Sequence, residues 1–159
     1  MSKGGLIGHF DSKEDLQINI LQHAFAGFRE AVMEPVSDEA DGQLRLQTLF
    51  MCWIAEVKDE SSSAGRLIFS AAAEFGDRPG PVRECALNLI AEFTAALKTH
   101  IQYATKDGSL SKDTDIKQFL FEWQSIMLGY HQYLKMGSTH GLMKKTEKAF
   151  DSLLERFSD

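Results

Sequence analysis

The chain has 159 residues, of which 43% are hydrophobic and 25% are charged, a composition typical of a globular domain rather than a disordered segment. Its 17 basic and 23 acidic residues give a net charge of −6, so the chain as a whole does not coat nucleic acid. The two cysteines are too few for a disulfide framework, and no apolar run reaches the roughly 18 residues of a membrane span. We therefore expect a cytoplasmic protein with no membrane partner.

Hydrophobic residues recur at helical spacing along the whole chain, and no alternating run typical of a β-strand lies between turn residues. The three prolines fall where helices are expected to begin or end. Together these patterns predict an all-α fold. The expected helices cover residues 12–34, 43–59, 65–75, 81–107, 113–136 and 142–157.

The first of these helices carries signals at both ends. Ser12 is expected to cap its N-terminus, because Asp15 lies three residues further on and places negative charge in the first turn. Pro35 is expected to end it, because a residue that precedes proline is disfavoured in the α conformation. The acidic segment 37–42 then predicts a linker to the second helix.

Two of the expected helices have more apolar surface than a single buried face requires. The helix over 65–75 is apolar nearly all round and is expected to be buried on most sides. In the helix over 113–136, Phe121 and Leu128 lie well off the main apolar stripe, although one buried face needs only about 100° of apolar arc. We infer that this helix contacts a second partner, most simply another copy of the chain.

The last helix places its apolar residues in a seam close to a heptad repeat. Two adjacent C-terminal helices with wide apolar faces predict a homodimer that is held by a four-helix bundle of these helices. The residues expected at this interface are Leu120, Trp123, Leu128, Phe150, Leu153 and Phe157.

The most specific motif lies at the start of the chain. Residues 2–16 read Ser-Lys-Gly-Gly-Leu-Ile-Gly-His-Phe-Asp-Ser-Lys-Glu-Asp-Leu. This string resembles the end of the helix-turn-helix domain in the TetR (tetracycline repressor) family of transcriptional regulators. The resemblance implies that residues 1–11 are the remnant of a DNA-binding domain that lacks its first two helices. Residues 12–159 would then form a C-terminal domain for ligand binding and dimerisation.

The same resemblance implies which residues contact operator DNA in the intact protein. Basic side chains at such positions reach phosphates, and glycines let a duplex backbone approach closely. Ile7 stands where the family usually has tyrosine, and Gly8 where a larger residue is usual, so fewer contacts are available. The residues expected to contact DNA are Ser2, Lys3, Gly4, Gly5, His9 and Lys13.

A second stretch, residues 65–83, is similar to a segment common in the regulatory domains of this family. The resemblance implies a site for a small, largely apolar effector among the central helices, although each aromatic side chain there also suits a plain core. Gln124, Ser125 and His131 are candidates to orient such a ligand. The residues expected to line the effector pocket are Phe50, Trp53, Phe69, Phe93, Trp123, Met127 and Tyr130.

The expected function is therefore a ligand-responsive repressor, whose effector releases operator DNA. The alternative is a helical module that binds a small molecule and has no DNA-binding activity. No histidine pair has the i, i+4 spacing of a helical metal site, so we expect no metal, no cofactor and no catalytic residue. The protein is therefore not expected to be an enzyme. Cys52 and Cys85 lie on apolar helix faces and are expected to act as small hydrophobes.

Overall fold

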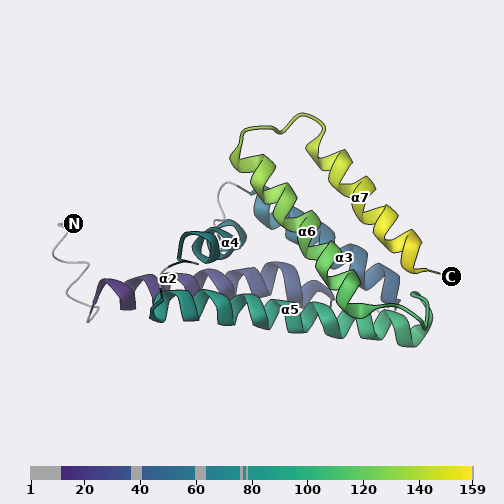
Figure 1. The fold of residues 1–159 in the computed structure, drawn as a ribbon, viewed down its shortest axis with the longest axis horizontal. Coiled ribbons are helices and arrows are strands. Elements are labelled where there is room, and N and C mark those ends of the chain that lie inside the picture. Colours follow the sequence, from purple (N-terminus) through teal and green to yellow (C-terminus); the bar gives the residue numbers. More distant parts are fainter. Residues whose placement is uncertain (1–11, 37–40, 60–63, 76, 78, 159) are drawn as a thin grey trace. The chain divides into compact units, whose positions relative to one another are not determined.

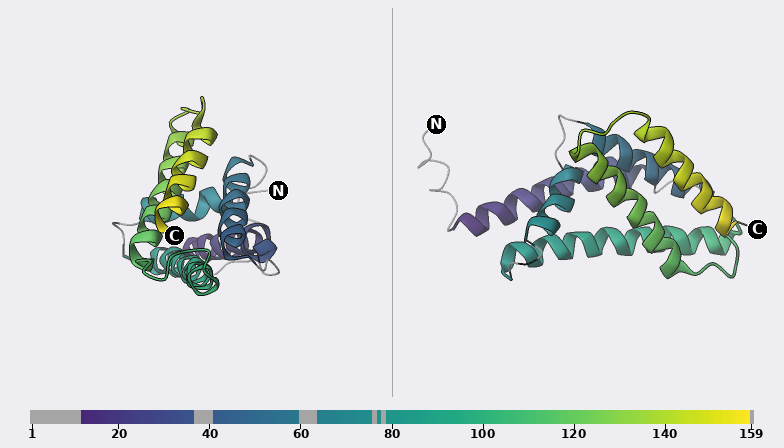
Figure 2. Two further views of the ribbon diagram at one scale, coloured as in Figure 1. Left: turned by 90° about the vertical axis from the view of Figure 1, so that its right-hand side faces the viewer. Right: turned by 45° about the horizontal axis from the view of Figure 1, so that its top comes forward.

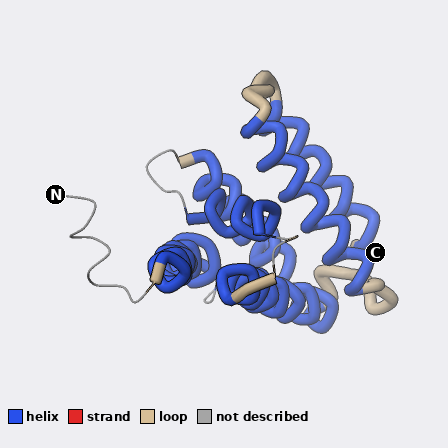
Figure 3. The backbone as a smooth tube through the Cα atoms, turned by 60° about the vertical axis from the view of Figure 1, so that its left-hand side comes forward, coloured by secondary structure: helices blue, strands red, loops and turns tan. Residues whose placement is uncertain are grey.

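The computed structural model describes residues 12–36, 41–59, 64–75, 77 and 79–158, and every regular element in these ranges is helical (Figure 1). In chain order the elements of these described ranges are α2 (Lys13–Phe28), a π-helical turn (Arg29–Met33), a 3-10 turn (Glu34–Val36), α3 (Gly42–Lys58), α4 (Ala64–Phe75), α5 (Pro81–Asp107), α6 (Ile116–Lys135) and α7 (Leu142–Phe157). Loops connect the helices that Figure 3 shows in blue. The prediction of an all-α fold is confirmed.

The N-terminus of α2 is capped by Ser12, as predicted. Its hydroxyl accepts a hydrogen bond from the backbone N–H of Asp15 at 3.0 Å and donates one to the Asp15 carboxylate at 2.9 Å. Glu14 and Asp15 also place negative charge at the positive end of the helix dipole. Local chemistry alone therefore accounts for where this helix begins.

The C-terminal end of this helix differs from the prediction. Regular α-helix ends at Phe28, and the backbone continues through the π-helical turn Arg29–Met33. Glu34 precedes Pro35 yet keeps helical dihedral angles (φ −69°, ψ −39°), and its N–H donates to the carbonyl oxygen of Arg29. The proline does not push its neighbour out of the α region. Instead the hydrogen-bond pattern widens, because a proline has no N–H with which to continue the helix.

The connection between α5 and α6 is shaped by a glycine and a side-chain cap. α5 ends at Asp107, and Gly108 follows it with a φ of +87°, a left-handed conformation that glycine adopts readily after a helix. α6 begins at Ile116 rather than at Asp113. The side chain of Asp115 accepts hydrogen bonds from two backbone N–H groups of the first turn, at 3.0 and 3.1 Å, and so determines this start.

The chain divides into two compact units. Unit 1 comprises the described parts of Met1–Glu34 and Cys52–Phe93, and unit 2 comprises the described parts of Pro35–Met51 and Thr94–Asp159. α3 and α5 each contribute residues to both units. The boundary predicted after residue 11 lies outside the described residues.

Unit 1 is built around α2 and the first part of α5, which run in the same direction (Figure 1). Leu21 of α2 belongs to a buried apolar cluster with Ala71 of α4 and Val82 of α5. Further along the same pair of helices, the ring of Phe28 meets that of Phe93 edge-on, with 5.2 Å between the ring centroids. These contacts hold α2 by its apolar face.

α4 is less buried than its composition predicts. Among its described side chains, Ala71 is buried, Leu67 and Phe69 are half-buried, and Ala73 and Glu74 are exposed. A run that is apolar nearly all round therefore does not require cover on every side, because its small alanines expose little surface.

Unit 2 contains α6 and α7, which lie side by side in both views of Figure 2. The amide of Gln124 on α6 donates a hydrogen bond to the Thr94 hydroxyl on α5 at 2.8 Å. At the far end of α7, the Ser111 N–H donates to the carbonyl oxygen of Phe157 at 2.7 Å. The loop before α6 thus satisfies a backbone acceptor that the end of α7 would leave unpaired.

Gly42, the first residue of α3, is expected to tolerate no side chain. A Cβ atom there would lie 2.5 Å from the Cα of Ala104 on α5, and the backbone of a packed helix cannot move away cheaply. We expect Gly42→Ala to lower the free energy of unfolding by about 1–3 kcal/mol, measured by urea denaturation. The matched control is Gly27→Ala, because no atom lies within 4 Å of that Cβ position. Equal stability of the two variants would contradict this packing argument.

Asp107 is expected to make stability depend on pH. Partial burial acts to raise the pKa of its carboxyl, but hydrogen bonds from Ser109 and Gly42 and the charge of Arg45 outweigh burial and lower this pKa. A folded-state pKa below the unfolded one means that the carboxylate stabilises the fold above the unfolded pKa. That stabilisation is lost as the pH falls from about 4 through the folded-state pKa.

We therefore expect Asp107→Asn to lower the melting temperature at pH 7. The difference from the parent chain should shrink as the pH falls from about 4 through the folded-state pKa of Asp107, because protonation makes that side chain neutral too. Thermal unfolding followed by circular dichroism at several pH values measures it. A difference that stays the same at all pH values would show that the charge of Asp107 contributes nothing.

Candidate functional site

An aromatic cluster forms the centre of unit 2. The rings of Phe50 and Phe150 are stacked, with centroids 3.9 Å apart and planes within 8°. Trp123 meets both edge-on, at 5.6 Å from Phe50 and 4.8 Å from Phe150. All three side chains are at most 3% exposed. Aromatic residues of α3, α6 and α7 thus share one packed site.

The residues predicted for a dimer interface fall into two groups. Trp123, Phe150 and Leu153 are buried within the chain itself, so we assign them to its core rather than to a contact with a second copy. Leu120 and Phe157 are half-buried, and Leu128 is 51% exposed. The helical period marks all six as apolar, but it does not distinguish a core from an interface. The interface itself stays a prediction.

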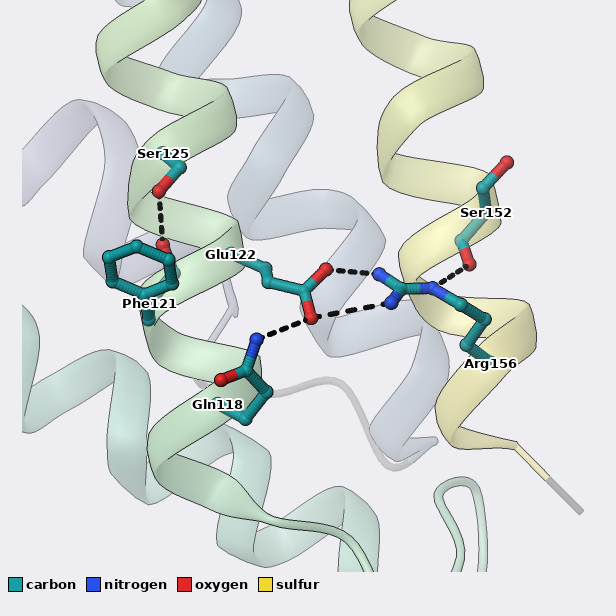
Figure 4. Close-up of polar contacts among 6 residues, drawn as sticks. All are labelled: Gln118, Phe121, Glu122, Ser125, Ser152 and Arg156. Carbon is teal, nitrogen blue, oxygen red and sulfur yellow. Dashed lines mark hydrogen bonds and ion pairs between the residues drawn. The ribbon is translucent and has the colours of Figure 1, made fainter.

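The apolar surplus expected on α6 is present in the structure. Phe121 is 66% exposed, Leu128 is 51% exposed and Met136 is 67% exposed. We call these residues, with Ser125 and Gln132 between them, the outer face of α6. The Ser125 hydroxyl donates to the Phe121 carbonyl oxygen of its own helix at 2.7 Å (Figure 4). Large exposed apolar side chains on one face are typical of an interaction site.

A polar contact holds α6 against α7 near the C-terminus of the chain. Arg156 of α7 forms an ion pair with Glu122 of α6, and Gln118 donates a second hydrogen bond to that carboxylate at 2.9 Å (Figure 4). Hydrogen bonds from Arg156 and Gln118 lower the pKa of Glu122. The pair lies at the surface, so it fixes the register of the two helices more than it stabilises them.

The predicted effector residues divide between the two units. In unit 1, Trp53 meets Phe69 edge-on at 6.5 Å, and Phe93 contacts Phe28 as described above. In unit 2, the indole N–H of Trp123 points at the sulfur atom of Met127 at 2.8 Å. Each unit therefore brings some of these residues together around buried aromatic rings. Their role in binding a ligand stays a prediction.

Two predicted effector residues line grooves in unit 2. Phe50 borders a groove of about 330 Å³ together with Gln47, Met51, Glu147 and Asp151. Tyr130 borders a second groove, of about 260 Å³, between α6 and α7. The α7 residues that line these grooves were not predicted to bind a ligand, because the sequence of α7 shows only an apolar seam. The signal that could have indicated them is the set of polar residues on either side of that seam.

Unit 1 has a groove of its own, of about 210 Å³, between α2, α4 and the start of α5. Leu21, Leu67 and Phe75 supply its apolar walls, and Gln17 and Glu74 supply polar groups. None of these residues belongs to the predicted effector set. Because several side chains of α4 are exposed or half-buried, they form one wall of this groove.

The polar candidates on α6 are engaged within the chain. Gln124 bonds to Thr94 and Ser125 to the backbone of its own helix, whereas His131 is only 6% exposed. Of the predicted DNA contacts, Lys13 lies exposed in the first turn of α2. Ser2, Lys3, Gly4, Gly5 and His9 lie outside the described residues.

The titratable groups of the described residues form no group of metal ligands. Burial raises the pKa of the Cys52 and Cys85 thiols, which keeps them protonated and unreactive. Burial, with the charge of Arg45, lowers the pKa of His100, so its imidazole is neutral at pH 7. No helix in the described part of the chain is both long and apolar enough to cross a membrane.

The all-helical fold, with its paired C-terminal helices and exposed outer face, is that of a helical regulatory domain. The family model described as "Tetracyclin repressor-like, C-terminal domain" matches residues 42–150. The chain therefore belongs to this family, and the resemblance drawn from the sequence is confirmed.

A solved structure shows the same fold. The structure of AibR in complex with isovaleryl coenzyme A and operator DNA matches this chain with a TM-score of 0.70 and 23% sequence identity. The match covers 83% of this chain and 69% of the AibR chain. No curated protein sequence matches the chain.

Proposed function

We propose that this chain is the effector-binding and dimerising part of a ligand-responsive transcriptional regulator that binds DNA and acts as a repressor. The observation that carries the proposal is the family match over residues 42–150, which spans α3 to most of α7. The likeness to AibR, whose structure holds an acyl coenzyme A and operator DNA, supports it through the shared fold. A regulatory domain of this family also favours a non-enzymatic role.

The homodimer is proposed to form through α6 and α7. The outer face of α6 supports this, because Phe121 and Leu128 expose apolar surface that a second copy would cover. With a two-fold axis, the same face of both copies meets, and four helices bury their apolar residues together. The two DNA-binding parts would then be held at a defined separation, as a palindromic operator requires.

The effector is proposed to be a small and largely apolar molecule that is enclosed by side chains of unit 2 such as Phe50, Trp123 and Met127. To act as a switch, it must bind one state of the dimer more tightly than the state that fits the operator. Binding then shifts the population away from the DNA-competent state. The isovaleryl group of isovaleryl coenzyme A, which is present in the AibR structure, is small and apolar in this sense, so this thioester is the first probe to try.

The experiment that tests the proposal is a selection of random duplex DNA by a version of the chain that includes a complete DNA-binding domain, with its oligomeric state checked by native mass spectrometry. We expect a dimer that enriches a palindromic sequence. A folded dimer that enriches no sequence would contradict the DNA-binding role. It would leave the alternative, a small-molecule-binding module without DNA-binding activity.

A further inference from the structure

We propose that the groove at the open end of the α6–α7 pair binds a small organic anion with an apolar body. The groove has a volume of about 260 Å³ and is lined by residues of both helices and of the turn that joins them. The proposal does not depend on DNA binding or on the effector role of the aromatic clusters. It concerns a groove of unit 2 that shares only Tyr130 with the residues predicted to line the effector pocket.

The inner walls of the groove are apolar. Ile126 of α6 and Leu142 and Ala149 of α7 supply aliphatic surface, and the ring of Tyr130 is only 4% exposed. Burial, together with the negative charge of Glu147, raises the pKa of the Tyr130 phenol. The phenol is therefore neutral at pH 7 and adds no negative charge to the site. These walls would therefore contact the apolar part of a ligand rather than its charged group.

The rim of the groove carries the positive charge of one lysine, Lys145. Lys145 and His140 both line it, and no carboxylate among the described residues lies within ion-pair distance of the Lys145 ammonium. Lys144 lies next to it at the start of α7, where the helix dipole adds positive potential. Apolar walls below a cationic rim select an amphipathic anion over a neutral or a cationic molecule.

The groove and the outer face lie on different sides of α6. Ile126, Tyr130 and Tyr133 follow the i, i+4, i+7 spacing of one helical stripe, and Phe121 and Leu128 belong to another. Dimer contacts through the outer face therefore need not fill the groove. Its volume is just below the roughly 300–1,000 Å³ of typical ligand pockets. That size fits a short carboxylate.

The test uses hexanoate as the probe and follows the backbone amides of the intact chain by NMR. We expect shifts that centre on Gly129, Lys145 and Thr146 and that saturate with concentration. Hexan-1-ol and hexylammonium are the matched neutral and cationic probes, and we expect both to bind more weakly. Equal binding of all three probes, or shifts centred elsewhere, would overturn the proposal.

Two variants distinguish the contribution of the Lys145 charge to binding from that of the groove itself. Lys145→Gln should weaken hexanoate binding about three- to fivefold, because a single exposed charge contact is lost. Lys148→Gln is its matched control, since Lys148 lies on the same helix and does not line the groove. Gly129→Leu should abolish binding, because its Cβ position is open and the new side chain fills the groove without a clash.

The contrary results are equally clear. If Lys148→Gln weakens binding as much as Lys145→Gln, the effect is one of general charge and the proposed rim is wrong. If Gly129→Leu keeps its dispersed amide spectrum and still binds hexanoate, the groove is not the site. Neither outcome affects the DNA selection described above, so failure of this proposal is distinguishable from failure of the proposed function.

Discussion

Replacing Phe121 and Leu128 together by glutamate is expected to convert the proposed homodimer into a monomer. Both side chains are more than half exposed on the outer face of α6, so the folded chain tolerates charge there. In a dimer the same carboxylates would be buried opposite apolar groups without partners. We expect a loss of about 2–4 kcal/mol, or roughly 30- to 1,000-fold in dimer affinity, as for residues central to an interface.

Native mass spectrometry and light scattering after size exclusion measure this change. The matched control is Leu87→Glu, which places a carboxylate at another exposed apolar position, on α5. This variant should remain dimeric. A parent chain that is monomeric at micromolar concentration would contradict the dimer directly. A double variant that stays dimeric would place the interface on another surface.

Trp123→Ala is expected to be the most destabilising single substitution in unit 2. The side chain has no exposed surface, and it contacts the rings of Phe50, Phe119 and Phe150. Removing a buried tryptophan leaves a cavity and costs about 3–5 kcal/mol. A domain of this kind has a free energy of unfolding of about 5–15 kcal/mol in total. The variant should therefore lose a large share of its stability.

Urea denaturation followed by far-ultraviolet circular dichroism measures this loss. Tyr133→Ala is the matched control, because it removes an aromatic ring from the same helix at a position that is 52% exposed. We expect that variant to differ from the parent chain by less than about 0.5 kcal/mol. A comparable loss in both variants would show that the aromatic cluster does not dominate the packing of unit 2.

The sequence by itself determined the fold class and the family. Six helices and most of their ends follow from helical periodicity, from a serine cap at residue 12 and from a left-handed glycine at residue 108. These signals act between residues a few positions apart, so they can be read without knowing what lies across the core. Two short stretches, residues 2–16 and 65–83, carry the family resemblance that the match over residues 42–150 confirms.

Periodicity also identified which helix has apolar surface to spare. Phe121 and Leu128 were expected off the main stripe of α6, and both are exposed. Periodicity did not identify where the chain departs from a regular helix. The π-helical turn before Pro35 is one such departure, and neither the apolar spacing nor the proline indicated it.

Only the tertiary structure decided how apolar residues divide between core, interface and groove. Trp123 and Leu128 were both expected at the dimer interface, yet Trp123 has no exposed surface and Leu128 is half exposed. The difference depends on which elements pack across each face, and that follows from long-range contacts rather than from spacing. The groove beside Tyr130 and Lys145 likewise could not be predicted from spacing, because residues of two different helices must lie side by side to form it.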